Sequence, residues 1–204
     1  MQLLNIFKQQ KHPSGFFLDD RHFNRLYPYG VRALSARHWT PVKIALSAAE
    51  FLGGENGSKI LDIGSGVGKF CLCAAHTKPN CLFFGIEQRA HLVQCAERTK
   101  RKLALGNAFF IHSNMTAVDF TDYNHFYFFN SFYEHLEPDI KIDRAIHHST
   151  TFYEYYTECL YEKLATLRRG TRLCTYFGRT SQVPESYRLI DSLYDEKLKL
   201  WIKS

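Results

Sequence analysis

Short apolar runs alternate with amphipathic stretches along most of the chain after residue 58. Runs rich in β-branched, aromatic and other apolar residues predict strands at 58–64, 81–87, 107–113, 125–130 and 171–178. Apolar residues recur at helical spacing between them, at 68–77, 89–105 and 151–170. Strands that alternate with helices in this way predict a parallel sheet with helices on both faces.

The two ends of the chain depart from this alternation. Residues 39–53 predict one more helix, with Thr40 as its N-cap, Pro41 in its first turn and Gly53 after its end. Residues 1–38 contain several breakers and predict irregular structure, so we expect an N-terminal extension at 1–38 and one domain at 39–204. Residues 186–204 contain two alternating runs around a polar turn, which predicts a hairpin with antiparallel strands.

Composition narrows the class of protein. The chain has 204 residues and 45% of them are apolar, enough for a substantial core. No apolar run approaches the length of a membrane span, and the first residues lack a secretory signal pattern, so we expect a cytoplasmic protein without membrane contact. Six cysteines without a C-x-x-C pair or matched histidines predict free thiols and no metal site.

The net charge of +6 is unevenly distributed. Residues 1–43 carry seven Lys and Arg side chains, which would suit a phosphate-bearing partner such as nucleic acid. Residues 134–162 carry seven Asp and Glu side chains, which would suit a cationic substrate. Both stretches can also be ordinary solvated surface, so charge alone leaves the partner open.

The most informative stretch is ILDIGSGVGKF, at residues 60–70. Glycines at 64, 66 and 68 remove three side chains from the turn between a buried strand and a helix, so a ligand can lie against the main chain near free helix amides. The dinucleotide fingerprint G-x-G-x-x-G would need a third glycine at position 69, where Lys69 stands. This mismatch and the terminal hairpin disfavour a dinucleotide oxidoreductase.

The pattern D-x-G-x-G-x-G, together with the order of elements, resembles the first motif of the class I, seven-stranded S-adenosylmethionine-dependent methyltransferases. The resemblance spans roughly residues 39–204. It implies an α/β three-layer sandwich in which a mostly parallel seven-stranded sheet ends in an antiparallel C-terminal hairpin. It also implies S-adenosyl-L-methionine as the cofactor and a methyl-acceptor substrate as the partner.

The resemblance assigns binding roles to matching positions. The glycine loop would face the methionine and ribose part of the cofactor, and Asp62 would help to place its amino-acid end. Glu87 at the end of the second strand would accept the two ribose hydroxyls. Asn114, where the family often has aspartate, would accept the adenine amino group, and Met115 would pack on the adenine face. The full set of expected cofactor-binding residues is Asp62, Gly64, Ser65, Gly66, Gly68, Phe70, Glu87, Gln88, Asn114 and Met115.

The end of the fourth strand is where the acceptor is expected. Many amine-directed members have an N/D-P-P-aromatic motif there, whereas this chain reads Asn130-Ser131-Phe132-Tyr133. It keeps the asparagine and an aromatic residue but has neither proline, and it is weakly similar to the seven-stranded histone lysine methyltransferases. Asn130 is the expected catalytic residue.

These residues predict methyl transfer to nitrogen of a protein lysine or a small amine, with nucleic acid as a possible acceptor. The missing prolines leave open a non-catalytic protein that binds S-adenosylmethionine in the same fold. The aromatic residues between 14 and 39 could form a lid over the pocket, or could simply pack an N-terminal extension on the sheet.

Overall fold

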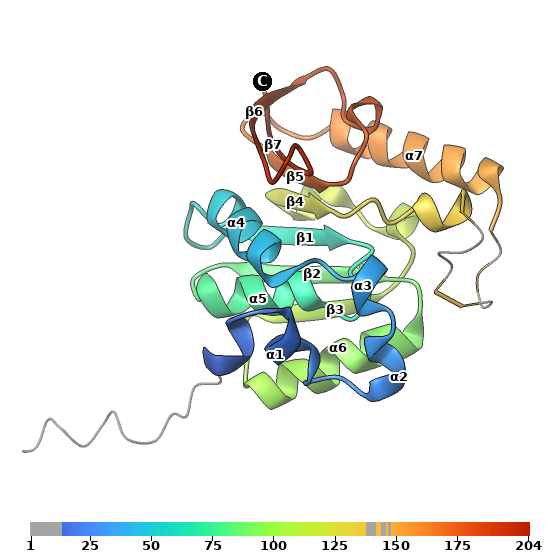
Figure 1. The fold of residues 1–204 in the computed structure, drawn as a ribbon. Helices are drawn as coiled ribbons and strands as arrows, with labels where there is room; N and C mark the ends of the chain where they lie inside the picture. Colours follow the sequence, from blue (N-terminus) through green and yellow to red (C-terminus); the bar gives the residue numbers. More distant parts are fainter. Residues whose placement is uncertain (1–13, 138–141, 144–145, 147) are drawn as a thin grey trace, which may run out of the picture.

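The computed structural model describes residues 14–137, 142–143, 146 and 148–204. A single seven-stranded sheet runs through the molecule in the order β3-β2-β1-β4-β5-β7-β6 (Figure 1). The strands are β1 Lys59–Ile63, β2 Leu82–Glu87, β3 Ala108–His112, β4 His125–Phe128, β5 Arg172–Tyr176, β6 Tyr187–Leu193 and β7 Leu198–Lys203.

The pairing of the strands confirms the predicted fold class. Strands β1 to β5 pair in parallel, and β7 is inserted antiparallel between β5 and β6. Strand order reverses between β1, which continues outward to β2 and β3, and β4, which continues to β5. The carboxyl ends of the parallel strands therefore meet beside this switch point, the place where open α/β sheets bind ligands.

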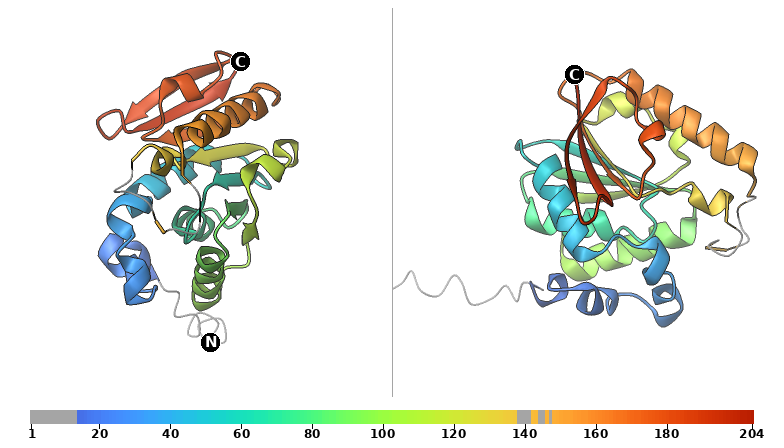
Figure 2. Two further views of the ribbon diagram at one scale, coloured as in Figure 1. Left: turned by 90° about the vertical axis from the view of Figure 1, so that its right-hand side faces the viewer. Right: turned by 45° about the horizontal axis from the view of Figure 1, so that its top comes forward.

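Helices cover both faces of the sheet (Figure 2). One face carries α4 Val42–Leu52, α5 Lys69–Thr77 and α6 Ala90–Leu103, and the other carries α7 Thr150–Ala165. The strands between them are almost fully buried, because a parallel sheet with covered faces has no solvent side.

The start of α4 differs from the expectation. The N-cap position is occupied by Pro41, and Thr40 does not cap the helix; its hydroxyl shares a hydrogen bond of 3.0 Å with the Tyr127 hydroxyl. The backbone N–H of Val42 instead donates to the carboxylate of Asp20, at 2.8 Å. A side chain more than twenty positions upstream therefore satisfies this helix end, which local sequence rules cannot predict.

The sequence had suggested irregular structure for the N-terminal extension, but the described part of it is helical. It forms the short helices η1 Ser14–Phe17, α1 Asp20–Asn24, α2 Tyr29–Arg32 and α3 Ser35–His38. Phe17, Phe23 and Tyr27 are buried against the domain, and the Tyr27 hydroxyl donates to the Val67 carbonyl at 2.9 Å. These aromatic residues pack the extension onto the domain, while α3 lies near the carboxyl edge of the sheet (Figure 1). The domain boundary at 38/39 stays a prediction.

None of the helices in the described part of the chain is long and apolar enough to cross a membrane. All six cysteines are free thiols, and Cys71, Cys73, Cys81 and Cys174 are buried.

Candidate functional site

The loop between β1 and α5 has a backbone that only glycine adopts readily. Gly64, Gly66 and Gly68 have φ angles of 76°, 54° and 79°, in the left-handed region. A Cβ at Gly64 would collide with the Ser131 side chain, and one at Gly68 with the Phe110 ring. A Cβ at Gly66 would meet nothing within 4 Å, because this residue faces open space. The three glycines therefore have different tasks, and Gly66 is the one that leaves room for a ligand.

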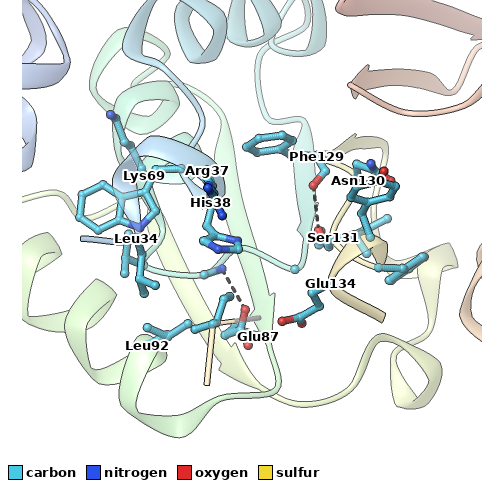
Figure 3. Close-up of a pocket in the computed structure, with 18 of the residues that line it drawn as sticks. Leu34, Arg37, His38, Lys69, Glu87, Leu92, Phe129, Asn130, Ser131 and Glu134 are labelled. Atoms are coloured by element: carbon cyan, nitrogen blue, oxygen red, sulfur yellow. Dashed lines mark hydrogen bonds between the residues drawn. The ribbon is translucent and has the colours of Figure 1, made fainter. Parts of the chain in front are cut away.

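A cavity of about 910 Å³ opens in front of this loop (Figure 3). Seven of the expected site residues line it, namely Gly64, Gly66, Glu87, Gln88, Asn114, Met115 and Asn130. Asp62, Ser65 and Phe70 instead line a small hollow that adjoins the cavity and shares Gly64 and Val67 with it. The Phe70 ring stacks on Tyr127 at 3.9 Å between centroids. Gly68 lines neither space, so for these four residues the cofactor contact stays a prediction.

Glu87 lies between the glycine loop and the start of α6. Its carboxylate accepts hydrogen bonds from the backbone N–H of Gly66, at 3.1 Å, and of Arg89, at 2.8 Å. Burial raises the pKa of Glu87, and these two hydrogen bonds and the Arg89 charge oppose that shift. The carboxylate thus sits beside Gly66, where a ligand has room against the loop, and this is compatible with the expected ribose contact.

Arg89 is a cavity-lining residue that the sequence analysis missed. Its guanidinium is buried and forms ion pairs with three carboxylates, Glu134 at 2.8 Å, Asp143 at 3.3 Å and Glu87 at 3.8 Å. The network joins the end of β2 to the segment after β4, across 45 residues of sequence. The only feature of the sequence that could have indicated Arg89 is its position directly after the Glu87-Gln88 pair.

Both polar atoms of the Asn114 side-chain amide already form hydrogen bonds. Its oxygen accepts from the Thr116 backbone N–H and hydroxyl, both at 3.0 Å, and its nitrogen donates to the Tyr156 hydroxyl at 2.9 Å and to the Gln88 oxygen at 3.3 Å. In this arrangement the amide orients Gln88 and Tyr156 at the cavity wall. The expected contact between Asn114 and an adenine amino group stays a prediction.

Asn130 lies two residues after the end of β4 and has an unusual backbone conformation. Its φ angle is 31°, and its side-chain oxygen is buried without a hydrogen-bond partner among the described residues. The neighbouring Ser131 hydroxyl donates to the Ile63 carbonyl at 2.8 Å and so ties this segment to the glycine loop. Strained backbone and an unpaired buried acceptor are costly, and such features gather at functional sites.

Side chains from the N-terminal segment also reach the cavity, which the sequence analysis did not resolve to residues. Arg37 and His38 project into it from α3 (Figure 3). Lys69, at the start of α5, is buried and donates to Asp20 and Asn24 of α1. The sequence showed that the extension is aromatic and basic, but it did not indicate which of its residues would face the cavity.

Asp62 is a buried ionisable group in β1. The side chain is 3% exposed and accepts a weak hydrogen bond from the Cys71 thiol at 3.6 Å. Burial raises the pKa of Asp62 to about 8, an effect that this hydrogen bond opposes and the Glu87 charge reinforces.

This shift predicts how the Asp62→Asn substitution changes stability with pH. The carboxyl has an ordinary pKa of 3.8 when the chain is unfolded and about 8 when it is folded. Between these two pH values the folded state binds a proton that the unfolded state has lost. The wild-type free energy of unfolding therefore falls as pH rises, by up to about 1.4 kcal/mol per pH unit. Asparagine resembles the neutral carboxyl and does not titrate.

The gain in stability of Asp62→Asn over wild type should therefore be smallest near pH 4 and grow until about pH 8, the folded-state pKa. Urea unfolding of both proteins across this pH range measures it. A difference that does not change with pH would show that the carboxyl is ionised in the folded chain.

A glycine-rich turn after the first strand of a parallel sheet, with an acidic residue at the end of the second, defines a Rossmann-like protein that binds a nucleotide cofactor. The chain belongs to the methyltransferase domain family, whose model matches residues 55–188, about two thirds of the chain. The cofactor is S-adenosylmethionine, in agreement with the resemblance noted in the glycine motif. The sheet has the seven strands and the antiparallel C-terminal hairpin expected for the class I members.

Individual proteins match the chain to different extents. A tRNA (guanine-N(7)-)-methyltransferase of Synechococcus sp. (strain JA-3-3Ab) is 42% identical over 55 residues, which cover 27% of this chain and 23% of that protein. TrmN from Thermus thermophilus has a TM-score of 0.59 at 15% identity, covering 84% of this chain and 51% of TrmN. The chain thus spans about a quarter of this curated relative and about half of TrmN.

An RNA methyltransferase from Salinibacter ruber, solved in complex with S-adenosyl-L-homocysteine, has a TM-score of 0.51 at 17% identity. The match covers 79% of this chain and 87% of that one. At these identities the two structural likenesses show the fold alone.

Proposed function

We infer that the chain transfers a methyl group from S-adenosylmethionine to a nitrogen atom of an RNA base. The observation that carries this inference is the buried side-chain oxygen of Asn130 at the cavity wall, which has no hydrogen-bond partner within the part of the chain that the structure describes. An acceptor nitrogen that bears hydrogen would satisfy this oxygen by donating to it, and the contact would hold the nitrogen in a fixed position.

The residues present fit the cofactor. Gly66 leaves space for it beside the loop, and the Glu87 carboxylate lies next to that space with free lone pairs for two hydroxyl groups. S-adenosylmethionine supplies an electrophilic methyl group on a sulfonium that leaves as a neutral thioether. Transfer to nitrogen therefore needs alignment and a place for the proton that the nitrogen loses.

His38 is placed to take that proton. Its ring projects into the cavity from α3 (Figure 3). Burial lowers the pKa of His38, with Arg89 and Arg37 acting in the same direction and Glu134 against them, so the imidazole is neutral near pH 7.

The charges around the cavity favour a neutral acceptor over a cationic one. Three carboxylates line it, Asp20, Glu87 and Glu134, and each of them already has a basic partner, Lys69 for Asp20 and Arg89 for the other two. A lysine ammonium would have to compete with these partners, whereas an aromatic amino group brings no charge. Arg37 and Arg179 also line the cavity and suit the phosphates of a nucleic acid. The tRNA methyltransferase relative supports a nucleic-acid acceptor, but it is named for guanine N7, a nitrogen without hydrogen, and so does not bear on the choice of an amino group.

A protein lysine or small amine is the second candidate, as the sequence had suggested. It is favoured by Glu134, a carboxylate four residues after Asn130 that lines the same cavity. This reading requires the Glu134 side chain to exchange its Arg89 partner for the substrate.

A tritiated-methyl transfer assay separates these alternatives. The protein is incubated with labelled S-adenosylmethionine and cell extract, and the extract is then split into protein, nucleic-acid and small-molecule fractions. We expect label in RNA. Label in protein or small molecules alone would favour the second candidate, and cofactor binding without label in any fraction would favour a non-catalytic protein.

The Asn130→Ala variant tests the role of the unpaired oxygen. We expect the rate of transfer to fall on the order of 100-fold, because the acceptor nitrogen loses its positioning contact, while binding of S-adenosylhomocysteine stays unchanged. The exposed Asn80, in the turn before β2, provides a matched control as Asn80→Ala. Normal transfer by Asn130→Ala would remove Asn130 from the mechanism.

A further inference from the structure

Phe177, directly after β5, is an exposed aromatic residue that neither the glycine motif nor the family match explains. Its side chain is 49% exposed and lines the cavity. Its φ angle is 53°, a left-handed conformation that is unfavourable for a bulky residue and that glycine would adopt more easily. A large ring thus occupies a position where it is half exposed and where the backbone conformation is unfavourable for it.

The ring is held by rigid surroundings. The Phe177 backbone N–H donates to the Lys197 carbonyl at 2.9 Å, which extends the pairing of β5 with β7. Its ring lies 4.6 Å from the Tyr176 ring and 6.2 Å from the Phe129 ring, with the latter at an interplanar angle of 30°. Phe129 and Tyr176 line the cavity too, and Phe129 directly precedes Asn130. The three rings form an aromatic group beside the proposed acceptor position.

We propose that Phe177 is the platform on which the acceptor base stacks, so that it sets the plane of the base relative to Asn130. The inference rests on the proposed function and names the residue that recognises the aromatic acceptor. Stacking on a half-exposed, pre-oriented ring needs no rearrangement and tolerates any base. Arg179, two residues further along and also at the cavity, would contact the adjoining phosphate.

The backbone strain makes a decisive variant available. Phe177→Gly removes the ring and relieves the left-handed strain, so it should leave the melting temperature unchanged or raise it. Ala104→Gly is the matched control, because exposed Ala104 at the end of α6 has the same φ angle of 53° and lies away from the cavity. Phe177→Trp keeps an aromatic surface.

Binding is measured with a fluorescein-labelled single-stranded RNA of mixed sequence, in the presence of S-adenosylhomocysteine. We expect Phe177→Gly to weaken RNA binding by about 5- to 150-fold, the range for loss of one stacked base, with binding of S-adenosylhomocysteine unchanged. Phe177→Trp and Ala104→Gly should bind RNA like wild type. An abasic oligonucleotide of the same length should bind wild type and Phe177→Gly equally.

The possible failures are distinguishable. If wild type and Phe177→Gly bind RNA equally and both methylate it, the platform is wrong and the proposed function stands. If wild type neither binds nor methylates RNA, the proposed function falls and the platform falls with it. A lower melting temperature together with weaker S-adenosylhomocysteine binding in Phe177→Gly would assign the ring a structural role and overturn the inference.

Discussion

The Gly66→Val variant is expected to lose cofactor binding, by 100-fold or more in the dissociation constant of S-adenosylhomocysteine. A side chain at this position would project into the space in front of the loop, where a Cβ meets no protein atom within 4 Å. A branched side chain there would fill the place of the ligand, and it would also crowd the Glu87 carboxylate that accepts the Gly66 N–H. Steric exclusion from a preformed site cannot be relieved by small shifts, because the loop is fixed on both sides by a strand and a helix.

Backbone strain has to be separated from this steric effect. Gly57 offers the matched control, since its φ angle is 81°, a Cβ there also meets nothing within 4 Å, and it lies in an exposed turn away from the cavity. Gly57→Val and Gly66→Val should each lower stability by about 1–2 kcal/mol for the left-handed backbone, but only Gly66→Val should lose binding. Isothermal titration and thermal unfolding of both variants provide the comparison. If Gly66→Val binds S-adenosylhomocysteine like wild type, the cofactor lies elsewhere.

The sequence predicted the fold well because the strands of a covered parallel sheet must be apolar. The runs that became β1, β2 and β4 have no solvent face, so their pattern does not depend on distant partners. The glycine turn was also recognisable from the sequence, because a left-handed backbone at alternate positions strongly favours glycine. These two local rules, together with the resemblance to the class I methyltransferases, placed Gly66, Glu87 and Asn130 at one site, and all three line the cavity.

The parts that were not predicted depend on contacts between distant segments. Helices α1, α2 and α3 are only four or five residues long, too short to carry a periodic signal. Phe23 of α1 and Tyr27 of the loop after it join the core formed by distant segments, whereas α2 and α3 bury no residue. Two of the three partners of Arg89, Glu134 and Asp143, lie 45 or more residues further along the chain. A single sequence, read without an alignment, contains no information on such pairs beyond the residue types themselves.

The Arg89→Met variant is expected to have the largest effect on stability, a loss of about 3–5 kcal/mol. Methionine fills much of the space of the arginine stem, but it leaves the buried carboxylates of Glu87 and Glu134 without their cation. Removal of one partner from a buried ion pair is costly because the remaining charge stays desolvated. The exposed Arg188, on the edge strand β6, provides the control as Arg188→Met, for which a change within about 0.5 kcal/mol is expected.

Two further measurements assign this loss to charge and not to packing. Burial already raises the pKa of Glu87, and without Arg89 the folded state should bind protons more strongly still, so the deficit of Arg89→Met should shrink as pH falls from about 8 to about 5. Addition of Glu134→Gln to Arg89→Met should recover part of the lost stability, since it removes one orphaned charge at nearly constant volume. A deficit that is the same at every pH and is not reduced by Glu134→Gln would mean that Arg89 acts through its packed stem, and the three carboxylates would then owe their positions to their own backbone contacts.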